Sequence, residues 1–138
     1  MAGAPTTTTY CSDRTDRLTS TTVANAVSGA NPVAAGMSAA ALVYDGQLNT
    51  TTRADQTLAY DVADRHLKTT ITGGASSGAI ITYARDATGR IASRVETPPG
   101  GGTATTTRST YAGAGDRAYA ILDTSNVRLR RMSISSSA

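Results

Sequence analysis

Residues 81–91 read Ile-Thr-Tyr-Ala-Arg-Asp-Ala-Thr-Gly-Arg-Ile, and this stretch decides the fold. Asp86 and Gly89 are residue types that a tight turn favours at its first and last positions. Before the turn, Ala79, Ile81 and Tyr83 fall on one face, and a period of two is typical of a half-buried strand. The stretch therefore predicts a β-hairpin whose arms span about 79–86 and 90–96.

The alternation continues on both sides of this hairpin. In each of two further strands, three residues are expected to share a face. These are Ile91, Ser93 and Val95 in the return arm, and Leu67, Thr69 and Ile71 in an earlier strand. The Gly- and Ser-rich segment 73–78 would connect that earlier strand to the next one. A second hairpin is therefore predicted between about 67–72 and 79–84.

The turn pattern itself recurs along the chain as Asp-x-x-(Asp or Gly)-Arg. The full copies place turns at Asp13, Asp16 and Arg17, at Asp61, Asp64 and Arg65, and at Asp86, Gly89 and Arg90. Degraded copies begin at Asp45 and Asp123. The Asp can accept from backbone amides two residues on, and Gly or Asp suits a position that needs positive φ. Each copy is therefore expected to be one hairpin, with a nearby Tyr that packs its ring and keeps its hydroxyl near water.

The composition suits a thin sheet better than a thick core. The 138 residues include 24 Thr and 13 Ser but 20 Leu, Val and Ile together, and neither Trp nor Phe. Thr is β-branched and suits a solvated, pleated surface. We predict an all-β fold in which antiparallel β-hairpin repeats form a curved, single-layer sheet or part of a β-shell. Residues 1–138 are expected to form one β region, with flexible breaks at 73–78 and 98–103 and a low-complexity Ala/Ser segment at 24–41.

Residues 33–43 leave a helical alternative open. They contain enough Ala to form a helix, but Gly36 interrupts them and they show no amphipathic stripe. A helix is therefore the weaker prediction for this segment. The chain has neither a run of about 18 apolar residues nor a basic and then apolar start. We expect no membrane span and no signal peptide in this chain.

The repeated turns resemble the YD repeats of the Rhs family. The resemblance is carried by residues 57–70, 81–96 and 111–129, and it extends over roughly 5–20 and 42–131. It implies a β-hairpin array of the kind that winds into a hollow shell around a toxin or effector, or that serves adhesion in the related teneurins. It also implies a secreted or cell-surface protein of a high-GC bacterial type, with adjoining YD repeats, further copies of itself or an enclosed toxin as partners.

The motifs that could carry catalysis are weak. Residues 74–78 match the Gly-x-Ser-x-Gly of serine hydrolases, but the single histidine, His66, precedes Ser76 and the residues after it indicate a strand. We interpret 74–78 as a hairpin loop and His66 as a half-buried sheet residue. Asp61 and Asp64 offer too few oxygen ligands for a metal, and Cys11 has no activating partner apart from Arg14. We expect no enzyme activity, no cofactor and no metal.

Arg128, Arg130 and Arg131 form a basic cluster near the C-terminus. Alternation predicts Arg128 and Arg130 on one strand face, where they could bind a polyanion or an acidic glycan, alone or with a stripe of Tyr. The competing interpretation is a solvated edge strand protected by charge. Two functions therefore remain: a structural β-repeat module, and a binding module that uses an Arg and Tyr face. Unpaired sheet edges also predict self-association.

Overall fold

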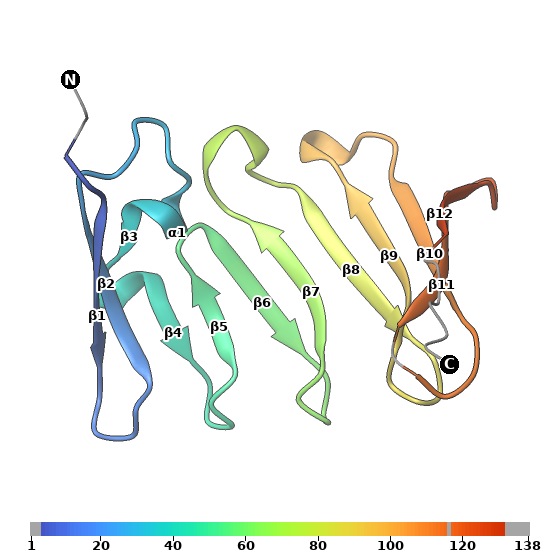
Figure 1. Ribbon diagram of the computed structural model, residues 1–138, viewed down its shortest axis with the longest axis horizontal. Coiled ribbons are helices and arrows are strands. Elements are labelled where there is room, and N and C mark those ends of the chain that lie inside the picture. Colours follow the sequence, from blue (N-terminus) through green and yellow to red (C-terminus); the bar gives the residue numbers. More distant parts are fainter. Residues whose placement is uncertain (1–3, 116, 132–138) are drawn as a thin grey trace, which may run out of the picture.

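The computed structural model describes residues 4–115 and 117–131, which form two antiparallel sheets and confirm the all-β prediction. The three-stranded sheet contains β1 (Thr7–Ser12), β2 (Leu18–Ala24) and β3 (Gly36–Met37). The nine-stranded sheet contains β4 (Leu42–Tyr44), β5 (Thr50–Arg53), β6 (Gln56–Tyr60), β7 (His66–Ile71), β8 (Ile80–Arg85), β9 (Ile91–Thr97), β10 (Thr105–Tyr111), β11 (Ala118–Leu122) and β12 (Arg128–Arg131). Figure 1 shows these strands side by side, and their order in the larger sheet is their order in the sequence.

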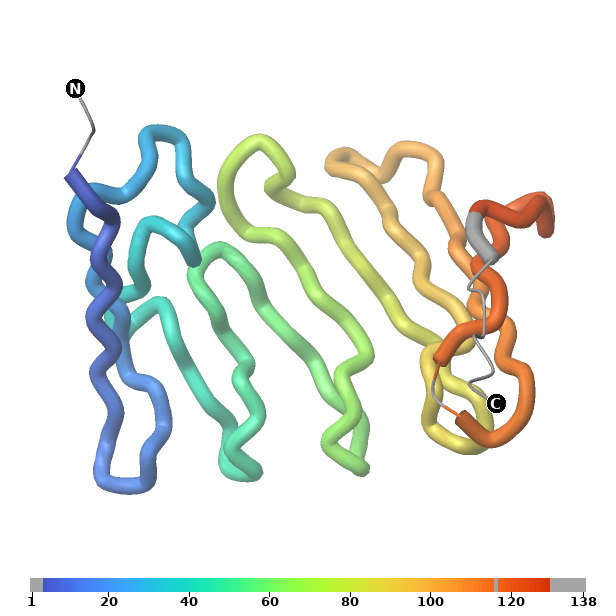
Figure 2. Tube along the Cα trace, viewed as in Figure 1, coloured from blue at the N-terminus to red at the C-terminus, as the bar shows by residue number. Residues whose placement is uncertain are grey.

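Both predicted hairpins are present. β8 pairs with β9 from Ile80–Thr97 to Arg85–Ile91, and β7 pairs with β8 through Lys68, Thr69 and Thr70. The chain runs up and down through consecutive hairpins from one end of the array to the other, as Figure 2 shows. Every strand in the larger sheet therefore contacts mainly its neighbours in sequence, which is the arrangement of a repeat array.

Five turns share one geometry, and they begin at Asp13, Asp45, Asp61, Asp86 and Asp123. In each turn the amide of the Asp donates to the carbonyl four residues on, at 2.9–3.0 Å. The amide three residues on donates back to the Asp carbonyl, at 2.9–3.1 Å. That donor residue has positive φ in each case: Asp16 (60°), Leu48 (72°), Asp64 (57°), Gly89 (86°) and Asn126 (62°). This is the three-residue hairpin loop in which a type I turn is followed by a left-handed residue.

A β-bulge follows each of these turns, and the sequence did not reveal it. In each of the five hairpins the register shifts beside the turn, so the second residue of the return strand has no partner. Ile91 pairs with Arg85 while Ser93 pairs with Ala84, so Ile91 and Ser93 do not share a face. Leu67 sits at a bulge and is exposed, unlike Thr69. The predicted face was wrong at Ile91 because one extra residue inverts the alternation.

The helical alternative for 33–43 is wrong beyond a single turn. Helix α1 (Pro32–Ala35) begins at Asn31, whose side chain accepts from the amide of Ala34 at 3.0 Å. Gly36 ends it with a φ of 105°, and a Cβ there would lie 3.0 Å from the carbonyl oxygen of Thr21. The chain therefore joins β2 as β3 before a 3₁₀ turn at Ala39–Ala41. Two further 3₁₀ turns, Gly74–Ser76 and Pro99–Gly101, occupy the expected breaks at 73–78 and 98–103, whose flexibility stays a prediction.

The two faces of the sheet differ. The tyrosine face carries Tyr44, Tyr60, Tyr83 and Tyr111, and the opposite threonine face carries Thr52, Thr57, Thr70 and Thr82. Strand β8 shows the contrast, since Ile81, Tyr83 and Arg85 are half-buried while Thr82 is exposed. Among the described residues, the apolar side chains below a tenth exposed are Met37, Leu42 and Ala120. The core is therefore small, as the composition indicated. No helix in 4–115 or 117–131 has the length and apolar character needed to cross a bilayer.

Candidate functional site

The turn carboxylates are the most regular chemical feature of the chain. In the β8–β9 hairpin, Asp86 Oδ1 accepts from the amide and hydroxyl of Thr88 at 2.9 and 2.7 Å and from the amide of Arg90 at 3.0 Å. Its Oδ2 accepts from Arg90 Nε at 2.8 Å. Asp13 and Asp61 make the same set with their own turns, apart from a hydroxyl that Ala63 cannot supply.

These bonds lower the pKa of the turn carboxylates. For Asp86 the largest cause is the hydroxyl of Thr88, opposed by desolvation, and Arg90 adds to it, so that its pKa falls well below the ordinary value. The Thr15 hydroxyl does the same for the pKa of Asp13. The pKa of Asp61 is lowered mainly by the amide of Arg65. Each Asp is therefore held ionised by its own loop, a structural arrangement rather than that of a general acid or base.

The predicted turn positions lie where the sequence placed them, and most lie along one sheet edge. The turns that begin at Asp13, Asp45, Asp61 and Asp86 follow the lower edge in Figure 1. The turn at Asp123 lies on the opposite edge, because β12 follows β11 across one more reversal of the chain. Its carboxylate still accepts from the amides of Ser125 and Val127 at 2.9 and 2.8 Å.

Neighbouring hairpins are joined by one recurring hydrogen bond. The last residue of an outgoing strand donates to the carbonyl of the first residue of the preceding return strand. Tyr44 reaches Leu18 at 2.8 Å, Tyr60 reaches Thr50 at 3.0 Å, and Tyr111 reaches Ile91 at 2.8 Å. Their hydroxyls are therefore bonded to the backbone instead of pointing to water, which corrects the expectation from sequence. The bond from Tyr44 also connects the three-stranded sheet to the larger one.

Arg85 takes the place of Tyr in the fourth of these contacts. It is the last residue of β8, and its Nη2 donates to the carbonyl of His66, the first residue of β7, at 3.3 Å. Its Nη1 donates to the carbonyl of Gly89 at 2.8 Å, while its Nε is buried without a partner. Arg85 therefore supplies the same contact as Tyr44, Tyr60 and Tyr111 with different chemistry.

The Arg of a turn reaches the next hairpin as well. The guanidinium of Arg17 lies 5.7 Å from the ring centroid of Tyr44, and that of Arg90 lies 4.3 Å from the ring centroid of Tyr111. Both distances are within the range of cation–π attraction. Arg90 Nη1 also donates to the carbonyl of Gly113 at 2.9 Å. The turn motif therefore stabilises its own hairpin and the contact with the following one.

His66 and Ser76 do not form a catalytic pair. His66 is the first residue of β7, and Ser76 lies beyond the opposite end of that strand, so they are on different sheet edges. The His66 ring packs between Tyr60 and Tyr83, with centroids 5.6 and 5.1 Å away, and its Nε2 contacts the carbonyl of Lys68 at 3.0 Å. The structure places His66 in sheet packing and Ser76 in a loop, which matches the interpretation from sequence.

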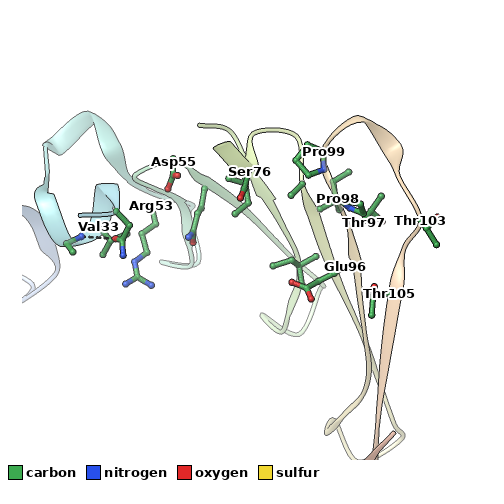
Figure 3. A pocket seen from close by; sticks show the side chains of 17 residues that line it. Val33, Arg53, Asp55, Ser76, Glu96, Thr97, Pro98, Pro99, Thr103 and Thr105 are labelled. Carbon is green, nitrogen blue, oxygen red and sulfur yellow. Dashed lines mark hydrogen bonds between the residues drawn. The ribbon is translucent and has the colours of Figure 1, made fainter. Parts of the chain in front are cut away.

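A groove of about 860 Å³ crosses the tyrosine face near its upper edge. Ile71, Ile81 and Glu96 line it from the sheet, Arg53 and Asp55 lie between these residues and Val33, and Pro99 lies in the loop after β9 (Figure 3). A second hollow of about 480 Å³ over β2 and β4 shares Val33, Ala34 and Arg53 with it. A continuous concave surface therefore runs from the three-stranded sheet to β10.

The groove carries charges of both signs beside an apolar floor. The side chain of Arg53 is exposed and makes no hydrogen bond or ion pair within the residues that the structure describes. Glu96 Oε1 accepts from Arg94 at 2.7 Å, which lowers the pKa of Glu96 and raises the pKa of Arg94. Sequence analysis did not single out these residues, since their proximity depends on strands distant in the chain.

The predicted basic cluster is described only in part. Arg128 is exposed and pairs with Leu122, which in turn pairs with Arg108 on the threonine face. Arg130 pairs with Ile121, so the bulge between them interrupts the alternation that predicted a shared face for Arg128 and Arg130. The side chains of Arg130 and Arg131 lie outside the described residues. Arg128 lies on the threonine face, opposite Tyr44, Tyr60, Tyr83 and Tyr111, so Arg128 does not share a surface with these residues.

No set of three or more His, Cys, Asp or Glu side chains that could hold a metal ion occurs in the described part of the chain. The candidate site therefore consists of the hydrogen-bonded sheet edge and the concave tyrosine face. Neither a scan against protein-family models nor a search of curated proteins finds a match to this chain.

Proposed function

We propose that this chain is a non-enzymatic structural module, a β-hairpin repeat array that builds or lines a surface. The observation that supports it is the recurring contact between hairpins: Tyr44, Tyr60, Arg85 and Tyr111 each bond the carbonyl at the start of the preceding return strand. Such a contact uses side chains to join one hairpin to the next. A repeat unit of this kind gains stability from each neighbour that it meets.

The resemblance to YD repeats suggests the setting for this module. On this proposal the chain is part of a secreted or cell-surface assembly, in which the concave tyrosine face encloses or presents a toxin, an effector or another copy of the sheet. Sequencing the flanking gene tests this setting. Further Asp-x-x-(Asp or Gly)-Arg hairpins around the chain would support it, and an enzyme domain that spans the chain without repeats would contradict it.

Hydrogen exchange tests the modular architecture itself. Asp61→Ala removes the carboxylate that holds the β6–β7 turn, and we expect faster exchange in β6, β7 and the adjoining β5 and β8. Exchange in β1, β2, β10 and β11 should not change, because an array transmits a defect to its neighbours only. The control is Asp55→Ala in the β5–β6 turn, since the Asp55 carboxylate makes no hydrogen bond within the described residues. Uniform acceleration across all strands, or a helical circular dichroism spectrum, would contradict the proposal.

A smaller polyanion-binding surface is the second candidate. The register places Arg108 and Arg128 on the threonine face on either side of Leu122. Two exposed guanidinium groups on the strands that flank β11 could contact phosphate or an acidic glycan. This surface lacks the Tyr stripe that the sequence interpretation gave it.

A further inference from the structure

The chain exposes more surface than a folded protein of its size needs. Its accessible surface is 9232 Å². A folded monomer of this mass is expected to expose roughly 6,700 Å², an excess of up to about 2,500 Å². Stable homodimers bury about 2,000–5,000 Å² in total over both partners. The excess is therefore large enough for a dimer interface.

The concave tyrosine face is the part of the molecule suited to that burial. Its floor at the groove is apolar, with Ile71 and Ile81 on adjacent strands, both half-buried. The threonine face is richer in hydroxyl side chains, which are stable in water, although Val43, Ile80 and Val95 also lie on it. Covering the tyrosine face would add to a core that contains few fully buried apolar residues.

The charges around the floor are self-complementary. Arg53 is on β5 and Glu96 is on β9, and β7 lies midway between them in the sheet. A two-fold axis along β7, in the plane of contact, would bring β5 of one copy over β9 of the other. A two-fold axis repeats every contact, so the contact between β5 of one copy and β9 of the other would form twice. Glu96 Oε1 is bonded to Arg94, but its second oxygen has no partner among the described residues and can accept from another guanidinium.

We propose that a second copy of this chain covers the tyrosine face in a two-fold, face-to-face dimer, in which Arg53 of each copy pairs with the partner's Glu96. The proposal rests on the structural function given above and specifies the partner of the concave face. A cargo domain of strong single-sign charge would fit this groove less well, because the groove carries charges of both signs: the guanidinium of Arg53 and the carboxylates of Asp55 and Glu96. Edge-to-edge pairing would bury a strand edge but leave the apolar floor in water.

Charge reversal with sedimentation velocity tests the pairing. The wild-type chain should sediment with the mass of two chains over a tenfold range of concentration. Arg53→Glu would place two carboxylates together at each pair, and we expect the dimer dissociation constant to rise at least about 30-fold. The double variant R53E/E96R exchanges the two charges and should recover most of the loss. Lys68→Glu makes the same change of charge on the threonine face and should leave the constant within about threefold.

Each outcome decides the proposal. A wild-type chain that stays monomeric, a dimer that R53E and K68E affect equally, or a double variant that stays dissociated would overturn it. Circular dichroism on every variant distinguishes loss of the dimer from a failure of folding. A folded monomer with local hydrogen-exchange behaviour would remove the dimer and keep the structural module, whereas a chain without β structure would remove the structural module itself.

Discussion

The hydroxyl of Tyr60 donates a 3.0 Å hydrogen bond to the backbone carbonyl of Thr50. The two residues lie at the end of β6 and at the start of β5, so the bond joins two successive hairpins at the sheet edge that also carries the Asp turns. Burial is the main cause that raises the pKa of Tyr60, and the charge of Asp45 contributes. The phenol therefore remains a neutral donor at neutral pH, and it fixes the distance between two repeat units.

Tyr60→Phe should lower the free energy of unfolding by about 0.5–1.5 kcal/mol, the usual contribution of one hydrogen bond with the ring packing kept. Urea denaturation monitored by circular dichroism measures this loss. Tyr10→Phe is the matched control, because Tyr10 is 69% exposed, and its effect should stay within about 0.5 kcal/mol. Equal effects of the two substitutions would show that the bond to Thr50 contributes nothing.

Stability should fall in acid because of the turn carboxylates. The pKa values of Asp13, Asp61 and Asp86 are lower in the folded chain than in an unfolded one. Their contribution is therefore fully present above the unfolded pKa of about 3.9 and is lost as the pH falls below it. Thermal unfolding between pH 7 and pH 2 should show a plateau and then a decline. Asp86→Asn should reduce stability at pH 7 and make the decline smaller, and an unchanged decline in this variant would rule out its carboxylate as a cause.

Leu48→Gly should stabilise the chain. Leu48 has a φ of 72° and is 58% exposed, so it bears the strain of a left-handed conformation with little packing in return. That strain is about 1–2 kcal/mol for an L-residue with a Cβ, and glycine is free of it at some entropic cost. We expect a gain of about 1 kcal/mol in urea denaturation. Val62→Gly, at an exposed turn position without positive φ, should instead be slightly destabilising, and a loss of stability in Leu48→Gly would refute the strain at that residue.

Heparin chromatography tests the polyanion surface. If Arg108 and Arg128 form it, the chain should elute at a salt concentration that falls clearly when both are replaced by Ala, since each phosphate or sulfate contact adds to the salt dependence. Arg14→Ala, at the exposed tip of the first turn, controls for net charge. Elution of the double variant with the wild type would exclude this surface.

The sequence predicted the hairpins because their signals are local. Asp86, Gly89 and Arg90 lie within five residues and fix the turn through bonds to one another. The left-handed residue was readable as Asp64 or Gly89 but not as Leu48, which has no preference for that conformation. The bulges were not readable either, because an extra residue leaves no mark in composition. Ile91 was therefore assigned to the wrong face of its strand.

The contacts between hairpins could not be predicted from a local sequence pattern, because they join residues that are distant in the chain. Tyr44 and Leu18 are 26 residues apart. A Tyr three residues before the Asp, as Tyr83, and one residue before it, as Tyr60, looked equivalent in the sequence. The structure separates them: Tyr60 bonds a carbonyl, whereas Tyr83 packs on His66. Arg85 precedes its turn Asp by one residue, as Tyr60 does, and makes the same contact with a different side chain.

The most direct test of the repeat architecture is therefore a pair of substitutions at Arg85, measured as free energies of unfolding in urea. If Arg85 and Tyr60 make equivalent contacts, Arg85→Tyr should retain most of the wild-type stability. The new hydroxyl can reach the His66 carbonyl as Tyr60 reaches that of Thr50. The substitution also removes the buried Nε that has no partner. Arg85→Ala should lose about 1–3 kcal/mol, because it leaves that carbonyl without its donor. A Tyr variant as unstable as the Ala variant would contradict the account that these hairpins are equivalent units joined by one recurring bond.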